Sequence, residues 1–250
     1  MKKHRTDQIS DTVPQMPGST RTASDVSRAG SDRVPEAADR RRSEVAAFIA
    51  EARRTAPPRT GTARGRLIFA LDATMSRQPT WDLACDLQAE MFDAAARSGG
   101  LDVKLSYFRG RNEARSSRWV GDARSLTGLM NGIACHGGLT QIGRILDHAG
   151  EEAATGPVAA LAYVGDAMEE DIDRLCHKAG KLAIHNTRAF MFLEGRDATA
   201  ERAYREIARL TGGAFLRFDP GAPAELRALL GAVGTYAAGG RAALEASGSN

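Results

Sequence analysis

Apolar runs alternate with amphipathic stretches between residues 66 and 237. The run at 67–71 has no polar position and ends at Asp72, which is typical of a strand buried on both faces of a parallel sheet. The segment 116–120 is flanked by polar residues and suits an edge strand. The six strands that the pattern predicts cover 67–71, 103–108, 116–120, 158–164, 188–193 and 215–218.

Apolar residues recur at helical spacing between these strands. The expected helices cover 81–98, 123–133, a segment that follows Thr140, 171–182, 200–210 and 224–236. This succession predicts an α/β fold: a doubly wound, mostly parallel six-stranded sheet with helices on both faces, similar to a Rossmann fold.

The rest of the chain differs from this central part in composition. Residues 1–42 are rich in Ser, Thr, Pro, Asp and Arg, so we expect a disordered basic tail. Residues 43–65 predict a short helix that begins at the cap-like Ser43 and ends at Arg54, followed by a Pro- and Gly-containing linker. Residues 66–237 form the expected folded domain, and 238–250 a flexible C-terminal tail.

Charge and hydropathy limit the classes of partner. Residues 1–66 hold 14 Lys and Arg against 8 Asp and Glu, whereas the remainder holds 20 against 23, so the basic character belongs to the tail. Acids are interleaved there and no aromatic precedes Phe48, so nucleic-acid binding is not expected. No apolar run approaches the roughly 18 residues of a membrane span. We therefore expect a cytoplasmic protein without a membrane partner.

Two pairs of adjacent Cys and His offer other chemistry. Cys135-His136 and Cys176-His177 do not have the spacing of a zinc site, so we interpret each as a packed thiol beside a surface imidazole. The three cysteines, which include Cys85, are odd in number and widely spaced, and reduced thiols are expected. A weaker hypothesis is that His136, close to Thr140 in sequence, tunes ligand binding near neutral pH.

Three short runs place carboxylates and hydroxyls at the ends of predicted elements. They are Asp72-Ala-Thr74-Met-Ser76 after the first strand, Gly137-Gly138-Leu-Thr140 before a helix, and Gly165-Asp166 after the fourth strand. Ligands bind doubly wound sheets beyond the carboxyl ends of the strands, where the strand order reverses. An oxygen-only set suits Mg²⁺ or Mn²⁺, and neutral hydroxyls leave much of the cation's charge for another anion. Each run alone is also explained as a helix cap.

These runs, in this order, resemble the von Willebrand factor A domain with its metal-ion-dependent adhesion site. That family's first motif is Asp-x-Ser-x-Ser, which Asp72, Thr74 and Ser76 match with Thr in place of the first Ser. Thr140 matches its lone Thr in a Gly-rich loop, and Asp166 matches its Asp after the fourth strand. The resemblance covers residues 66–237.

The resemblance implies a protein-binding module rather than an enzyme. It implies that Asp72, Thr74, Ser76, Thr140 and Asp166 surround Mg²⁺ or Mn²⁺, some of them through water. An open coordination position then accepts a carboxylate from a protein partner. Intracellular members of the family often work within assemblies that contain an ATPase or a chaperone, so such an assembly is the expected partner. The alternative within the family is a scaffold without an active metal site.

An enzymatic alternative starts from the same first Asp. Asp72 followed much later by Asp166 and Glu170 is also similar to a haloacid-dehalogenase-type phosphotransferase, in which Asp72 would be the nucleophile and the other two would hold Mg²⁺. Such enzymes carry an acid/base Asp where this chain has Thr74, and they need a phosphate-binding cation, for which Lys104 and Arg144 are the candidates. We expect Glu169-Glu170-Asp171 to begin a helix instead of joining the metal site.

Overall fold

The computed structural model describes residues 33–54, 64–96, 99–219 and 221–247. The chain divides into two units, Met1–Arg40 and Arg41–Asn250, and only the start of helix α1 (Arg33–Arg54) is described in the first. The predicted disorder of residues 1–32 and the predicted linker at 55–63 lie outside the described residues. The second unit contains the sheet and its helices.

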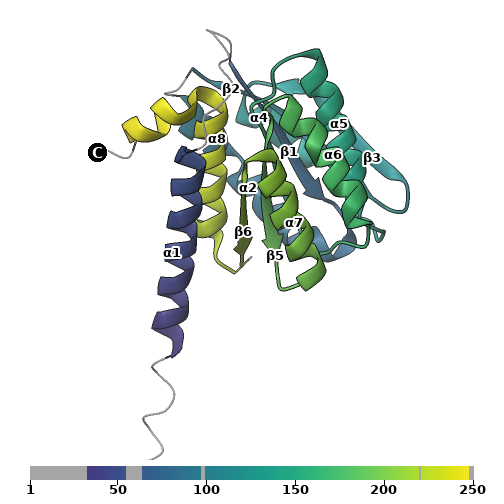
Figure 1. The fold of residues 1–250 in the computed structure, drawn as a ribbon, viewed down its shortest axis with the longest axis horizontal. Coiled ribbons are helices and arrows are strands. Elements are labelled where there is room, and N and C mark those ends of the chain that lie inside the picture. Colours follow the sequence, from purple (N-terminus) through teal and green to yellow (C-terminus); the bar gives the residue numbers. More distant parts are fainter. Residues whose placement is uncertain (1–32, 55–63, 97–98, 220, 248–250) are drawn as a thin grey trace, which may run out of the picture. The chain divides into compact units, whose positions relative to one another are not determined.

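A single six-stranded sheet forms the centre of the second unit (Figure 1). Its order is β3-β2-β1-β4-β5-β6, and every neighbouring pair is parallel except β2 and β3. The strands are β1 (Gly65–Asp72), β2 (Leu101–Arg109), β3 (Glu113–Val120), β4 (Ala160–Gly165), β5 (Arg188–Glu194) and β6 (Ala214–Phe218). The order reverses between β1 and β4, because the chain first winds from β1 outward to β3 and then returns to the other side of β1.

Helices cover both faces of this sheet. Helices α5 (Ile142–Thr155), α6 (Ile172–Ile184) and α7 (Ala198–Thr211) lie side by side on one face (Figure 1). The other face packs against α1, α2 (Gln78–Leu87), α3 (Ala89–Ala96), α4 (Ala123–Met130) and α8 (Pro223–Ser247). Alternate residues of β1 enter the two cores, Phe69 on the α8 side and Ile68 on the α5 side. The predicted doubly wound α/β fold is confirmed.

Element boundaries differ from the sequence pattern in places. The helix predicted over 81–98 is two helices, which break at Gln88, whose buried side chain donates hydrogen bonds to the Ala123 carbonyl and to Thr127 Oγ1. A short 3₁₀ helix, η1 (Met75–Arg77), precedes them. Helix α4 ends at Met130, whereas the pattern extended it to residue 133.

Two helices are longer than predicted. Helix α1 begins at Arg33 instead of Ser43, so residues 33–42 are helical although they were assigned to the tail. Pro35 lies in the first turn of this helix, and Glu, Ala and Arg follow it. These residues favour a helix locally, whereas the composition of residues 1–42 as a whole indicates disorder. Helix α8 likewise continues past Tyr236 to Ser247, and its Ala-rich sequence explains the extension. Among the described residues, no helix combines the length and the apolar character needed to cross a membrane.

Candidate functional site

Two aspartates lie at the point where the strand order reverses. Asp72 is the last residue of β1, and Asp166 follows Gly165, the last residue of β4. The two strands are parallel neighbours, so both carboxylates stand at the same edge of the sheet. Tyr204 of α7 fixes the second loop, because its hydroxyl donates a hydrogen bond of 2.9 Å to the Ala167 carbonyl.

The turn after β1 connects the first aspartate to two hydroxyls. Asp72 Oδ1 accepts a hydrogen bond of 2.8 Å from the Thr74 N–H, which holds the turn into η1. Thr74 Oγ1 lies 3.4 Å from Ser76 Oγ, and Ser76 Oγ donates to Asp166 Oδ2 over 3.1 Å. Four of the five predicted oxygen ligands therefore form one connected group.

The fifth residue, Thr140, is carried by a loop that packs against the β2–β3 hairpin. The Leu139 N–H donates to the Gly110 carbonyl over 3.1 Å, and the Gln141 side chain donates to the same carbonyl over 3.2 Å. A Cβ on Gly138 would lie 2.1 Å from that oxygen, so only glycine permits the approach. The hairpin thus determines where Thr140 lies.

Glu169 holds Thr140 in place, a contact that the sequence analysis missed. Its carboxylate accepts hydrogen bonds from the Thr140 N–H at 3.0 Å and from Thr140 Oγ1 at 2.8 Å. The Glu169 N–H donates to Thr140 Oγ1 over 3.2 Å, which leaves one lone pair of that hydroxyl for a further partner. Asp171 caps α6 through the Arg174 N–H, as expected of a residue that begins a helix, whereas Glu170 accepts the Gly143 N–H at the start of α5, which was not predicted.

All five predicted residues line one pocket of about 200 Å³. The structure therefore brings together the residues that the sequence singled out. Glu169 also lines the pocket, whereas Glu170 does not. The complete lining is Asp72, Thr74, Met75, Ser76, Gly137, Gly138, Thr140, Asp166, Ala167 and Glu169.

The pocket carries negative charge without a matching cation. Asp72 is 2% exposed, and its burial raises the pKa of its carboxyl from 3.8 to about 6, with a smaller contribution from the charge of Asp166. The hydrogen bonds from Thr74 act in the opposite direction. Arg77 is buried nearby, but its guanidinium forms an ion pair with Glu194 of β5. Within the described part of the chain, neither pocket aspartate has an ion-pair partner.

This donor set fits a hard divalent cation. Two carboxylates and three hydroxyls at one end of the sheet are oxygen ligands of the kind that Mg²⁺ and Mn²⁺ prefer, and a cation would relieve the repulsion between the aspartates. The described residues contain no group of three or more His, Cys, Asp or Glu placed to bind a metal. Any metal bound here would therefore depend on the hydroxyls.

The contacts of the candidate phosphate-binding cations give the phosphotransferase alternative no support. Lys104 forms an ion pair with Glu152 of α5. Arg144 donates to the Asn112 carbonyl over 2.7 Å, and neither cation lines the pocket. Glu170, the expected magnesium ligand of that mechanism, accepts backbone hydrogen bonds at the start of α5 instead.

The Cys-His pairs lie as predicted. Cys135 is buried and Cys176 half-buried, while His136 and His177 are exposed. The three cysteines are free thiols, of which Cys85 is also half-buried. His136 donates its backbone N–H to the Ala73 carbonyl, but its side chain does not line the pocket.

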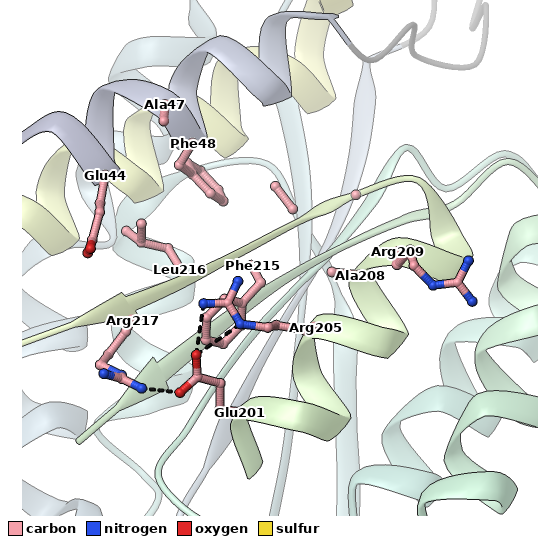
Figure 2. Close-up of a pocket in the computed structure, with 12 residues that line it drawn as sticks. Glu44, Ala47, Phe48, Glu201, Arg205, Ala208, Arg209, Phe215, Leu216 and Arg217 are labelled. Carbon is pink, nitrogen blue, oxygen red and sulfur yellow. Dashed lines mark hydrogen bonds and ion pairs between the residues drawn. The ribbon is translucent and has the colours of Figure 1, made fainter. Parts of the chain in front are cut away.

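A larger groove of about 530 Å³ lies beside the edge strand β6, lined by residues of α1 and α7 (Figure 2). Three of its charged groups pair with one another: Glu201 accepts hydrogen bonds from both Arg205 and Arg217. The Arg205 guanidinium also lies 4.3 Å from the centre of the Phe215 ring. The described lining of the groove contains no Ser or Thr, so the smaller pocket, which combines carboxylates with hydroxyls, is the stronger candidate for metal binding.

Solved structures share this fold. A von Willebrand factor type A protein from Catenulispora acidiphila matches with a TM-score of 0.53 and 20% identity over 69% of this chain. Proximal thread matrix protein 1 of the mussel byssus, solved with a zinc-occupied MIDAS motif, matches with a TM-score of 0.55 and 15% identity over 68%. The SpRpn10 VWA domain matches with a TM-score of 0.51 and 12% identity over 63% of this chain and 89% of its own.

The fold is that of von Willebrand factor A domains. At these identities the likeness extends to the fold alone. This chain spans 43% of the C. acidiphila protein and 46% of the mussel protein, so each of those contains much that has no counterpart here. No family model matches the sequence, and no curated protein matches it either.

Proposed function

We propose that this protein is a metal-dependent protein-binding module. Its pocket binds Mg²⁺ or Mn²⁺ through Asp72, Thr74, Ser76, Thr140 and Asp166, and the metal captures a carboxylate of a partner protein. The observation that carries this proposal is the convergence of all five residues, from three separated segments, on one small pocket.

The charge of the donor set supports the choice of ligand. Only two of the five proposed ligands, Asp72 and Asp166, are ionisable, and the three hydroxyls add no charge. A metal with few anionic ligands and an open position favours an anion from outside, and the pocket is open to solvent at the exposed Ser76. We place the partner in an intracellular assembly with an ATPase or a chaperone, as the sequence resemblance implies.

The test is a metal titration of the purified protein. After treatment with EDTA, added Mg²⁺ or Mn²⁺ should raise the free energy of unfolding by about 2.7 kcal/mol at one hundred times the dissociation constant. Asp166→Ala and Thr140→Ala should abolish the increase. Asp86→Ala removes an exposed acid of α2 outside the pocket and should retain it.

Two results would reject the proposal. A wild-type protein that is not stabilised by either metal would be a scaffold without an active metal site. Magnesium-dependent hydrolysis of a phosphate ester that is lost in Asp72→Asn would favour the phosphotransferase, because a binding module has no turnover.

A further inference from the structure

Large apolar side chains are exposed at only three positions among the described residues. Met75 is 62% exposed, Leu139 is 54% exposed and Ile184 is 79% exposed. Met75 lines the pocket, and Leu139 lies between Gly138 and Thr140, which also line it. Ile184 lies at the end of α6 and does not line the pocket. Two of the three exposed apolar residues thus lie on segments that form one pocket of about 200 Å³, Met75 in its lining and Leu139 between two lining residues; we call these two the rim residues.

The backbone fixes both rim residues next to the metal ligands. Met75 begins η1 between the two hydroxyl residues Thr74 and Ser76. The Leu139 N–H is bonded to the Gly110 carbonyl, which ties its loop to the β2–β3 hairpin. A side chain held at the surface by a fixed backbone cannot turn inward at low cost, so both apolar groups stay in contact with water until something covers them.

We propose that the partner presents its acidic side chain with large apolar residues beside it. This inference rests on the proposed function and names the chemistry of its ligand. The carboxylate would bind the metal, while neighbouring apolar side chains cover Met75 and Leu139. Burial of both supplies affinity that one exposed ion contact does not, and it keeps water away from the bond between metal and carboxylate.

The rim favours such a protein segment over other anions. A phosphate-rich ligand would gain from surrounding cations, whereas the described lining of this pocket contains no Lys or Arg, and the large exposed side chains on its segments are Met75 and Leu139. A free carboxylic acid without apolar neighbours would leave both side chains in water. A protein segment supplies the acid and the apolar cover together, which is the usual composition of an interface core.

The experiment compares two fluorescent synthetic peptides of equal length and charge. In one, a single Glu is flanked by Leu on both sides; in the other, the same Glu is flanked by Ser. With saturating Mg²⁺, fluorescence anisotropy should show that the Leu-flanked peptide binds at least about tenfold more tightly. EDTA should abolish the binding of both.

Two variants test whether Met75 and Leu139 cause the preference for the Leu-flanked peptide. The double variant Met75→Ser with Leu139→Ser should lose most of the tenfold difference while it keeps the stabilisation by Mg²⁺, because both side chains are exposed and neither is a proposed ligand. Ile184→Ser is the matched control, since it removes an exposed apolar side chain at the end of α6, outside the segments that line the pocket. It should retain the full preference.

The outcomes separate this inference from the proposed function. Loss of the Mg²⁺ stabilisation in the wild type refutes the metal site and this inference with it. If Mg²⁺ still stabilises the protein but the two peptides bind equally, or neither of them binds, the proposed role of Met75 and Leu139 is overturned and the metal site is not. A magnesium-dependent dimer that dissociates in the double variant would assign the rim to a second copy of the chain, and it too would overturn the partner proposed here.

Discussion

Asp72 lies in an environment that opposes its ionised form. A carboxylate that is 2% exposed has lost most of its hydration, and its compensation in the described structure comes from the N–H and the hydroxyl of Thr74, with a smaller contribution from the charge of Arg77. A buried charge of this kind usually has an ion-pair partner or a metal. The raised pKa of Asp72 measures what burial costs when no cation is bound.

The free energy of unfolding, measured as a function of pH, should reveal the cost of burying Asp72. The folded-state pKa of Asp72, about 6, lies above its ordinary value of 3.8, so the native protein holds a proton that the unfolded chain has released. Raising the pH from about 4 to 6 therefore favours unfolding, by roughly 3 kcal/mol from this group. Asp72→Asn lacks that contribution, and urea denaturation in EDTA should show the wild type losing stability relative to the variant over this range.

Saturating Mg²⁺ provides the control for this prediction. A bound metal would hold the Asp72 carboxylate deprotonated in the native state, so with saturating Mg²⁺ the loss of stability between pH 4 and 6 should disappear, and the stability that Mg²⁺ adds should grow as the pH rises to 6. A difference between wild type and Asp72→Asn that stays constant from pH 4 to 8 in EDTA would contradict the assignment of the raised pKa to Asp72.

At the scale of elements, the site depends on contact between a loop and a hairpin that are distant in sequence. Gly138→Ala would place a Cβ 2.1 Å from the Gly110 carbonyl oxygen, and the loop must move to relieve the clash. Because Thr140 is two residues further on, we expect about tenfold weaker Mg²⁺ binding and a loss of roughly 1–3 kcal/mol in stability.

The neighbouring glycine is the matched control. A Cβ on Gly137 meets nothing within 4 Å, so Gly137→Ala should leave both the metal affinity and the stability near their wild-type values. Calorimetric titration with Mg²⁺ and denaturant unfolding measure the two quantities. Equal effects of the two substitutions would mean that the loop is not positioned by the hairpin.

The acidic residues of the site show which contacts the sequence can predict and which it cannot. Asp72 and Asp166 could be placed together in advance, because each follows an apolar run and parallel strands share their carboxyl edge. Glu169 could not, because its bonds to Thr140 join the start of one helix to the loop before another. Local pattern assigns such an acid to a helix cap, and only the packed structure distinguishes the two roles.

The boundaries of helices and strands also differ in whether their causes are local or lie far away in the sequence. Five of the six strands are recognisable as apolar runs, and β3 as a short edge segment flanked by polar residues. The break at Gln88 was not, since its cause is a buried side chain that bonds to Ala123 and Thr127 of another helix. The apolar residues keep their helical spacing through this break, so the sequence does not reveal it.

At the scale of the whole molecule, stability and binding depend on different parts of the fold. The pocket is made by the segments that follow β1 and β4 and by the loop at 137–140, whereas the core extends over the whole sheet to helix α1. Phe48 of α1 is 3% exposed and its ring lies 5.8 Å from that of Phe190 and 5.4 Å from that of Phe192. It does not line the pocket.

Phe48→Ala should therefore lower stability without changing metal binding. Removal of a buried aromatic ring leaves a cavity and costs about 3–5 kcal/mol, which denaturant unfolding would measure. The increment that Mg²⁺ adds should be the same as in the wild type, because distant sites contribute additively. Ile184→Ala, at an exposed position, should change stability by no more than about 0.5 kcal/mol. A Phe48→Ala protein as stable as the wild type would show that α1 is not part of the core, and a lost Mg²⁺ increment would show that the core and the pocket are coupled.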